Sequence, residues 1–239
     1  MTPFKVLVMD TNGVYSAQPL LLSRVDFFLD LGRLRGIRYM CSPESLERLQ
    51  RFLPNFGRTI TFLGDGECHH LSLLFLKRQR EPFTLVVLDS HFDFREESGV
   101  VRCDGWLANV LALKKVKRVI LFGCRGYEGR FRHFFFMNPP LVALRRLLNG
   151  EWIYLSVDKD VLRNSPTKWG GGEMDLEELM NILKCLPKRK ITGIDICGEP
   201  DPQDLLKLRE SERLNLMIVD TFLSPPHLSS RDLQVITSR

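Results

Sequence analysis

Residues 84–93 read TLVVLDSHFD, a continuous apolar run followed by two carboxylates and a histidine. A run that is apolar at every position, and not only at alternate positions, is typical of a strand buried on both faces of a sheet. Side chains at every second position of an extended chain point to the same side, so Asp89, His91 and Asp93 can converge. The stretch therefore predicts a buried strand that ends in a group of metal-ligand residues.

Similar apolar runs recur along the chain, with helical-looking segments between them. The predicted strands are Phe4–Met9, Ile37–Met40, Thr59–Leu63, Thr84–Leu88, Arg118–Phe122, Trp152–Val157, Ile191–Ile196 and Met217–Val219. Ser42 as a cap and Pro43 in the first turn predict a helix that stops near Pro54. Apolar residues at helical spacing from Met174 to Leu186 predict another. This alternation favours a three-layer α/β/α fold with a mainly parallel central sheet.

The composition is that of a soluble globular protein, because 44% of the 239 residues are hydrophobic and 26% are charged. No linker or repeat interrupts the chain, so we expect a single domain over residues 1–239. No apolar run approaches the ~20 residues of a membrane span or forms a signal-peptide core, so we expect a cytoplasmic protein without a membrane partner. The 6 cysteines lie too far apart for a zinc knuckle or a small disulfide framework. The net charge of +5 is mild and its basic clusters flank predicted strands, so nucleic acid is not the expected partner.

Four predicted strands end in residues of the same kind. In an open parallel sheet, ligands bind beyond the carboxyl ends of the strands. The segments that follow the four strands are Gly64–His70, Asp89–Asp93, Asp158–Asp160 and Cys197–Pro200. Like charges gathered at a buried sheet edge are costly, and a divalent cation removes that cost. The sequence therefore predicts a metal site at this edge.

The charge balance predicts two metal ions. Two divalent cations would neutralise four carboxylates, with two histidines as neutral ligands: Asp89, Asp93, Asp158 and Asp160, with His69 and His91. His70 is the alternative to His69, which we favour because it lies one step before the following helix. Carboxylate and imidazole ligands suit Mn²⁺, with Fe, Co, Ni or Zn as alternatives. Two ions about 3.5–4 Å apart can hold a bridging hydroxide as nucleophile, so hydrolysis is the predicted reaction class.

These motifs resemble those of the ureohydrolase superfamily, which contains arginase, agmatinase and formimidoylglutamase. The family's D-A-H-x-D motif is similar to residues 89–93, its S-x-D-x-D motif to 156–160 and its G-G-D-H motif to 64–69; its strand with an acidic residue before Pro resembles 193–200. The motifs stand in family order over residues 59–202.

The resemblance implies an arginase-like fold and a binuclear manganese centre with two Mn²⁺ per chain. The implied ligands are His69, Asp89, His91, Asp93, Asp158 and Asp160. It also implies a small-molecule substrate, and it allows a homo-oligomer.

The implied activity is hydrolysis of a linear, non-peptide C–N bond in a guanidino, amidino or formimino compound. The resemblance implies that Glu199 holds the planar cationic group of the substrate, which a carboxylate accepts bidentately. Asp93 is expected to take the proton released in the attack and to pass it to the leaving nitrogen. Two alternatives stay open: a metal-dependent amide hydrolase such as a deacetylase, and a metal-binding protein of arginase fold without catalysis.

The chain also departs from the family pattern. Arginases carry a histidine in the loop after D-x-H-x-D, and Cys103 occupies about that place here, so we expect Cys103 to line the pocket without being a nucleophile. Arg95 resembles the basic residue in the formimidoylglutamase version of that motif, and it would suit an anionic substrate. One extra residue, Gly198, separates Asp195 from Glu199. The substrate is therefore left open.

Overall fold

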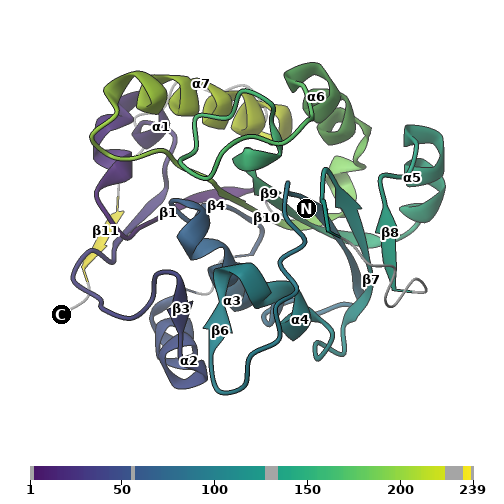
Figure 1. Ribbon diagram of the computed structural model, residues 1–239, viewed down its shortest axis with the longest axis horizontal. Coiled ribbons are helices and arrows are strands. Elements are labelled where there is room, and N and C mark those ends of the chain that lie inside the picture. The colour runs from purple at the N-terminus through teal and green to yellow at the C-terminus, as the bar shows by residue number, and fades with distance from the viewer. Residues whose placement is uncertain (1–2, 55–56, 127–133, 224–233, 238–239) are drawn as a thin grey trace.

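In the described part of the chain, the central sheet of the computed structural model has nine strands in the order β11-β2-β1-β4-β10-β9-β5-β7-β8 (Figure 1). The structure describes residues 3–54, 57–126, 134–223 and 234–237, the last four by their backbone. The strands are β1 (Lys5–Asp10), β2 (Phe27–Asp30), β4 (Thr59–Phe62), β5 (Phe83–Leu88), β7 (Val116–Phe122), β8 (Phe135–Met137), β9 (Trp152–Asp158), β10 (Ile191–Cys197) and β11 (Gln234–Thr237). Every pairing between them is parallel. The predicted parallel sheet is confirmed.

Helices cover both faces of this sheet. They are α1 (Pro19–Leu22), α2 (Pro43–Phe52), α3 (Ser72–Leu76), α4 (Trp106–Val110), α5 (Leu141–Leu147), α6 (Leu176–Cys185) and α7 (Leu205–Phe222). Short 3₁₀ turns lie at η1 (Val14–Ala17), η2 (Gly66–Leu71), η3 (Cys103–Gly105), η4 (Lys159–Val161) and η5 (Lys188–Lys190). A small antiparallel pair joins β3 (Met40–Cys41) to β6 (Val101–Arg102).

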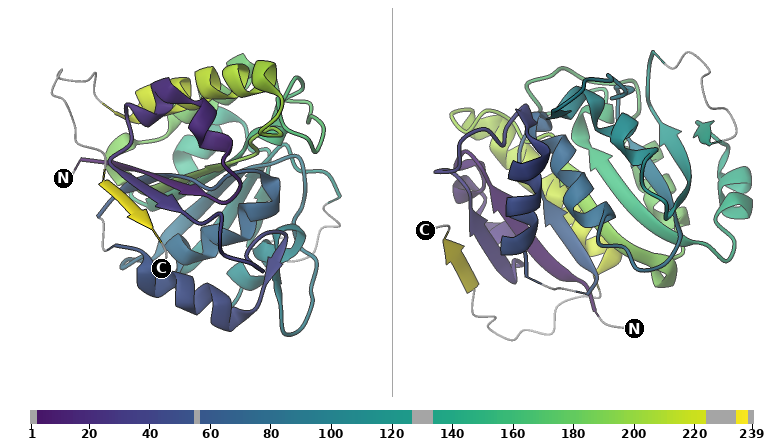
Figure 2. Two further views of the ribbon diagram at one scale, coloured as in Figure 1. Left: turned by 90° about the vertical axis from the view of Figure 1, so that its left-hand side faces the viewer. Right: turned by 90° about the horizontal axis from the view of Figure 1, so that it is seen from below.

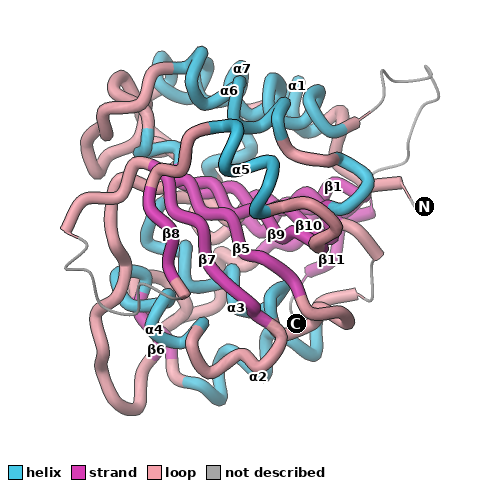
Figure 3. The backbone as a smooth tube through the Cα atoms, turned by 90° about the vertical axis from the view of Figure 1, so that its right-hand side faces the viewer, coloured by secondary structure: helices cyan, strands magenta, loops and turns pink. Residues whose placement is uncertain are grey.

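The helices form two layers. Helices α1, α5, α6 and α7 lie on one face, and α2, α3 and α4 lie on the other (Figure 1 and Figure 3). The right-hand view of Figure 2 shows the second layer in front of the strands. One buried apolar cluster fills each interface between helices and sheet. This is the predicted three-layer α/β/α architecture.

The two predicted helices form where their caps indicate. The Ser42 side chain accepts a hydrogen bond from the Ser45 backbone N–H at 3.1 Å, which satisfies a free donor at the start of α2. Asp175 caps α6 in the same way, through the Glu178 N–H at 2.8 Å. Helix α6 ends before Pro187, which cannot continue it.

Two predicted strands are wrong. Met217–Val219 lies inside α7, whose buried residues recur at helical spacing: Leu208, Ser211, Asn215, Ile218 and Phe222. A three-residue apolar run cannot distinguish a strand from the buried face of a helix. In the segment 37–40 only Met40 is in a strand, the short β3. The strands β2, β8 and β11 were not predicted.

The sheet order brings the four predicted ligand-bearing ends together. Strands β4, β10, β9 and β5 are consecutive neighbours, and because they are parallel, their carboxyl ends share one edge. Among the described residues, no helix has the length and apolar character that a membrane span requires.

Candidate metal centre

His69 faces three carboxylates. Its Nδ1 atom lies 3.2 Å from Asp89 Oδ2, 3.5 Å from Asp93 Oδ2 and 3.7 Å from Asp158 Oδ2. Both His69 and Asp89 are 1% exposed. The His69 Nδ1 and Asp89 Oδ2 atoms are buried without a hydrogen-bond partner in the described part of the chain. Four ligand-type groups from the ends of three strands therefore meet around one position.

A second group lies beside the first. His91 Nδ1 is 2.7 Å from Asp160 Oδ2 and 3.7 Å from Asp89 Oδ1. Asp89 thus presents one oxygen to each group, and both groups have the spacing of candidate metal sites. The structure brings together all six residues that the sequence predicted as ligands.

Backbone hydrogen bonds hold these carboxylates in place. Asp158 Oδ1 accepts from the Asp160 N–H at 2.9 Å, and Asp89 Oδ1 accepts from the His91 N–H at 2.7 Å. Asp160 Oδ1 accepts from the Ser90 N–H at 3.0 Å, which ties the end of β9 to the end of β5. The ligand groups are therefore oriented by the strand ends themselves.

The hydrogen bonds of His69 determine which ring nitrogen faces the carboxylates. Ser156 Oγ donates to Asp195 Oδ1 at 2.6 Å, and His69 Nε2 lies 2.9 Å from the same Oγ atom. Because the Ser156 proton is used on Asp195, Nε2–H donates to Ser156, and Nδ1 faces the carboxylates. Burial favours the neutral ring, but contacts with Cys197, Asp89 and Asp93 raise the pKa of His69 well above its ordinary value, so a metal ion at Nδ1 would replace a proton there. Metal-ligating histidines are commonly fixed by such an outer partner. Sequence analysis did not assign Ser156 or Asp195 a role, although Ser156 opens the S-x-D-x-D motif.

The electrostatics of the cluster fit a divalent cation. Burial, followed by the nearby charge of Asp89, raises the pKa of Asp93 to about 7. Burial and the charge of Asp160 raise the pKa of Asp158 well above its usual range. Without a cation, the cluster would therefore have to take up protons to relieve its own repulsion. A lone pair and several carboxylates in a buried position are a donor set that fits two divalent ions.

His70 is placed differently from His69. Its ring is buried outside the ligand groups, and burial lowers its pKa to about 4, so it stays neutral. Of these two histidines, the favoured His69 is the one that lies in the cluster.

A pocket of about 160 Å³ opens onto the candidate metal centre. It is lined by Tyr39, Gly66, His91, Asp93, Cys103, Asp104, Asp158, Asp160 and Trp169. Cys103 is among these residues, as expected. Burial raises the pKa of its thiol to about 12, so it is protonated at neutral pH. Tyr39 and Trp169 were not predicted as site residues, because their loops carry no motif and meet the site only in the folded chain.

Arg95 is placed beside this pocket but does not line it. Its side chain is 60% exposed, 3.6 Å from Asp104 and 3.9 Å from Glu97. The structure does not bring Arg95 together with the metal-ligand residues.

Glu199 lies in an environment that its predicted role does not fit. It is fully buried, forms an ion pair with the fully buried Lys159, and does not line the pocket. Its remaining hydrogen-bond partners are Gln18 at 2.7 Å, Ser211 at 2.7 Å and Asn215 at 2.8 Å. A substrate cation would have to displace Lys159 to reach this carboxylate. This corrects the expected contact of Glu199 with substrate: Glu199 anchors the Asp158–Asp160 turn to α7.

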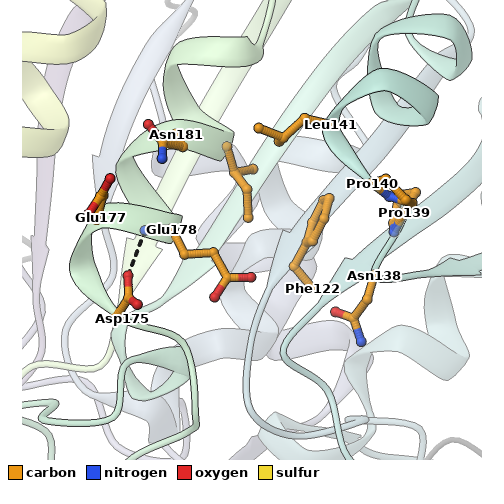
Figure 4. A pocket seen from close by; sticks show the side chains of 10 residues that line it. Phe122, Asn138, Pro139, Pro140, Leu141, Asp175, Glu177, Glu178 and Asn181 are labelled. Atoms are coloured by element: carbon orange, nitrogen blue, oxygen red, sulfur yellow. Dashed lines mark hydrogen bonds between the residues drawn. The ribbon is translucent and has the colours of Figure 1, made fainter.

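A second hollow of about 410 Å³ lies between α5 and α6 (Figure 4). Asp175, Glu177 and Glu178 are among the residues that line it, and Asp175 is also the cap of α6. It shares no lining residue with the pocket at the candidate metal centre. None of the predicted site residues lies there.

The chain is similar in sequence to a protein of Thermotoga maritima that is described as uncharacterized. The two are 42% identical over 219 residues, which cover 92% of this chain and 90% of the relative. No family model matches the chain.

Several solved structures have the same fold. An arginase from Bacillus subtilis aligns with a TM-score of 0.63 at 13% identity, over 95% of this chain and 100% of the arginase. The agmatine ureohydrolase of Thermoplasma volcanium aligns with a TM-score of 0.59 at 14% identity, over 92% of this chain and 90% of that enzyme. Proclavaminate amidino hydrolase from Streptomyces clavuligerus aligns with a TM-score of 0.58 at 18% identity, over 74% of this chain and 68% of that chain.

Proposed function

The chain belongs to one family with the Thermotoga maritima protein and has the fold of the ureohydrolase superfamily, and from this premise we propose that it is a binuclear metal-dependent hydrolase. The proposed substrate is a small molecule with a linear, non-peptide C–N bond, in a guanidino, amidino or formimino compound. The solved structures of this fold include enzymes named for agmatine and for an amidino compound.

One observation carries the proposal: Asp89 contributes an oxygen to each of two adjacent ligand groups at the base of a pocket. A shared carboxylate between two groups suits a pair of divalent ions, of which Mn²⁺ fits the carboxylate and imidazole donors. When bound, such a pair supplies hydroxide near neutral pH and stabilises the charge that develops on the substrate. His69, Asp89, Asp93 and Asp158 would hold one ion, and His91, Asp89 and Asp160 the other.

The residues of the chain itself position the substrate and move the proton. Trp106 Nε1 donates to Asp93 Oδ2 at 3.1 Å, which orients this carboxylate at the pocket wall. Asp93 is the proposed proton carrier between the attacking water and the leaving nitrogen. Tyr39 and Trp169 line the pocket, and the faces of their aromatic rings can accept a planar cationic group of the substrate.

A second candidate is a metal-binding protein without catalysis, and one observation favours it. Glu199, the residue expected to recognise a guanidinium, is engaged by Lys159. The presence of Glu199 in the sequence therefore does not favour an enzyme over a non-catalytic metal-binding protein. The pocket beside the metal-ligand residues is what favours catalysis over this alternative.

The test begins with metal content. Protein reconstituted with Mn²⁺ should bind about two ions per chain. It should then release urea, ammonia or formamide from a member of a panel of guanidino, amidino, formimino and neutral amide compounds. Asp89→Asn, which keeps the side-chain shape, serves as the inactive control.

Three outcomes separate the candidates. Release that needs the metal and is lost in Asp89→Asn supports the hydrolase. Two bound ions with no turnover of any compound support the non-catalytic protein. Binding of no divalent ion removes both proposals.

A further inference from the structure

Cys197 lies at the metal centre although sequence analysis gave it no role. In the register of β9 and β10, Cys197 is the direct neighbour of Asp158. Its Sγ atom lies 3.2 Å from Asp158 Oδ2, and the side chain is fully buried. The thiol therefore belongs to the His69 side of the cluster.

Gly198 explains why Cys197, and not Glu199, faces the ligands. Gly198 has a φ of 86°, in the left-handed region that favours glycine. A Cβ atom at this position would lie 2.5 Å from Asp158 Oδ1, so the chain passes directly over that carboxylate. The turn at Gly198 directs the next side chain, Glu199, away from the candidate ligands and toward Lys159. The extra residue in the motif thus leaves a thiol beside the metal-ligand carboxylate.

The distances around Cys197 are those of ligands to one ion. His69, Asp158 and Cys197 each offer an atom, and these atoms lie within 4.8 Å of one another. Two ligand atoms at about 2.1 and 2.3 Å from one Zn²⁺ ion lie roughly 3–4 Å apart. Independently, His69 Nδ1 and Asp89 Oδ2 are buried there without a hydrogen-bond partner in the described residues.

We propose that Cys197 is a thiolate ligand of the ion on the His69 side, and that this site takes a softer divalent ion than Mn²⁺, such as Zn²⁺, Co²⁺ or Fe²⁺. The inference rests on the proposed metal centre and deepens it. Thiolate selects zinc and related ions, whereas carboxylate alone suits Mg²⁺ and Mn²⁺. As the ion binds, the S–H bond breaks, the sulfur keeps the electron pair and the proton leaves to solvent. Among the residues that the structure describes, the candidate ligands on the His91 side are Asp89, His91 and Asp160, without a cysteine, so the two ions differ in their donors.

The experiment is a Co²⁺ titration of the metal-free protein, followed by absorption spectroscopy. A sulfur ligand produces a strong charge-transfer band in the near ultraviolet, which oxygen and nitrogen ligands do not. We expect this band to saturate with one of the two ions and to disappear in Cys197→Ser and Cys197→Ala. Cys103→Ser and Cys124→Ser are matched controls, since both thiols lie near the cluster and the band should persist.

Metal competition gives a second readout that does not depend on activity. In Cys197→Ser, the preference for Zn²⁺ over Mn²⁺ should fall by at least about tenfold, because the soft donor is lost and the carboxylates remain. Circular dichroism and thermal unfolding show whether Cys197→Ser is folded. If it is not, the competition is measured with Cys197→Ala.

The outcomes distinguish this inference from the proposed function. If the wild-type protein binds two Co²⁺ ions without a sulfur band, Cys197 only donates its S–H to Asp158 and the inference is wrong. A band that persists without Cys197 also overturns it. If the protein binds no Co²⁺, Mn²⁺ or Zn²⁺ at all, the proposed metal centre itself fails.

Discussion

Two buried polar clusters lie on opposite sides of the Asp158–Asp160 turn, and they differ in how their charges are satisfied. Toward the pocket, carboxylates gather around His69 Nδ1, and ligand atoms remain without hydrogen-bond partners among the described residues. Toward α7, Lys159 and Glu199 neutralise one another, and Gln18, Ser211 and Asn215 complete their hydrogen bonds.

The difference separates a binding site from a structural anchor. His69 and Asp89 are nearly as buried as Lys159 and Glu199, so burial of charge alone does not mark a functional site. An ion pair with every group satisfied has no capacity left for a ligand. A group of like charges with free ligand atoms must take up protons or bind a cation, and it therefore retains the capacity to bind a metal ion.

The largest expected effect comes from the carboxylate shared by both metal groups. Asp89→Asn should abolish binding of both ions and lower kcat/KM by at least about a thousandfold, because the hydroxide is then no longer supplied. Burial alone would raise the pKa of Asp89, but its contacts with His69 and His91 lower this pKa to about 2, so metal-free Asp89→Asn should unfold at a somewhat lower temperature than the metal-free parent. Elemental analysis and calorimetry measure the two effects. Retention of both ions would show that Asp89 is not shared.

In the buried Lys159–Glu199 pair, the expected effect of removing one charge is a loss of stability. Lys159→Met leaves Glu199 buried and unpaired, so the free energy of unfolding should fall by about 3–5 kcal/mol in chemical denaturation. The double variant Lys159→Met with Glu199→Gln should recover more than half of this loss, because no unpaired charge remains.

A surface pair of the same type is the control for this prediction. Lys117 contacts Glu151 at 2.6 Å, and its side chain is 42% exposed. Lys117→Met should cost no more than about 1 kcal/mol, because solvent screens the pair. An equal loss in Lys117→Met and Lys159→Met would contradict the anchor role.

Removal of the outer partner of His69 should have an intermediate effect. Ser156→Ala frees the His69 ring to turn or to change tautomer, and metal affinity should fall by about 10–100-fold. Isothermal titration with Mn²⁺ measures this, and thermal unfolding of the metal-free variant checks the fold. Unchanged affinity in a folded variant would show that His69 is fixed by its packing alone.

The smallest expected effect is at the pocket wall. Cys103→Ser should lower activity by no more than about tenfold, or ~1.4 kcal/mol of barrier, because the thiol is protonated and does not attack. The measurement is kcat/KM on the substrate identified by the panel. Trapping of a covalent adduct on Cys103 would overturn the proposed mechanism.

The sequence by itself determined the central strands of the sheet, their parallel direction and the group of candidate ligand residues. Continuous apolar runs such as Thr84–Leu88 are buried on both faces, and because the strands are parallel, their acidic ends lie at one edge of the sheet. Period-two spacing determined that Asp89, His91 and Asp93 share a side. These are local properties, so they can be inferred from the sequence without the fold. Short runs such as Met217–Val219 were misassigned because three apolar residues fit either a strand or a buried helix face.

Only the tertiary structure decided which acidic residues face the pocket. Glu199 is one position away from Gly198, and a left-handed turn there sends its side chain to Lys159 and leaves Cys197 beside Asp158. The hydrogen-bond partners of Glu199 come from distant segments of the chain: Gln18, Ser211 and Asn215. No local sequence pattern therefore indicates them. Whether a buried carboxylate is neutralised by a lysine or left for a metal ion depends on contacts between elements far apart in the chain, and such contacts exist only once the layers have packed.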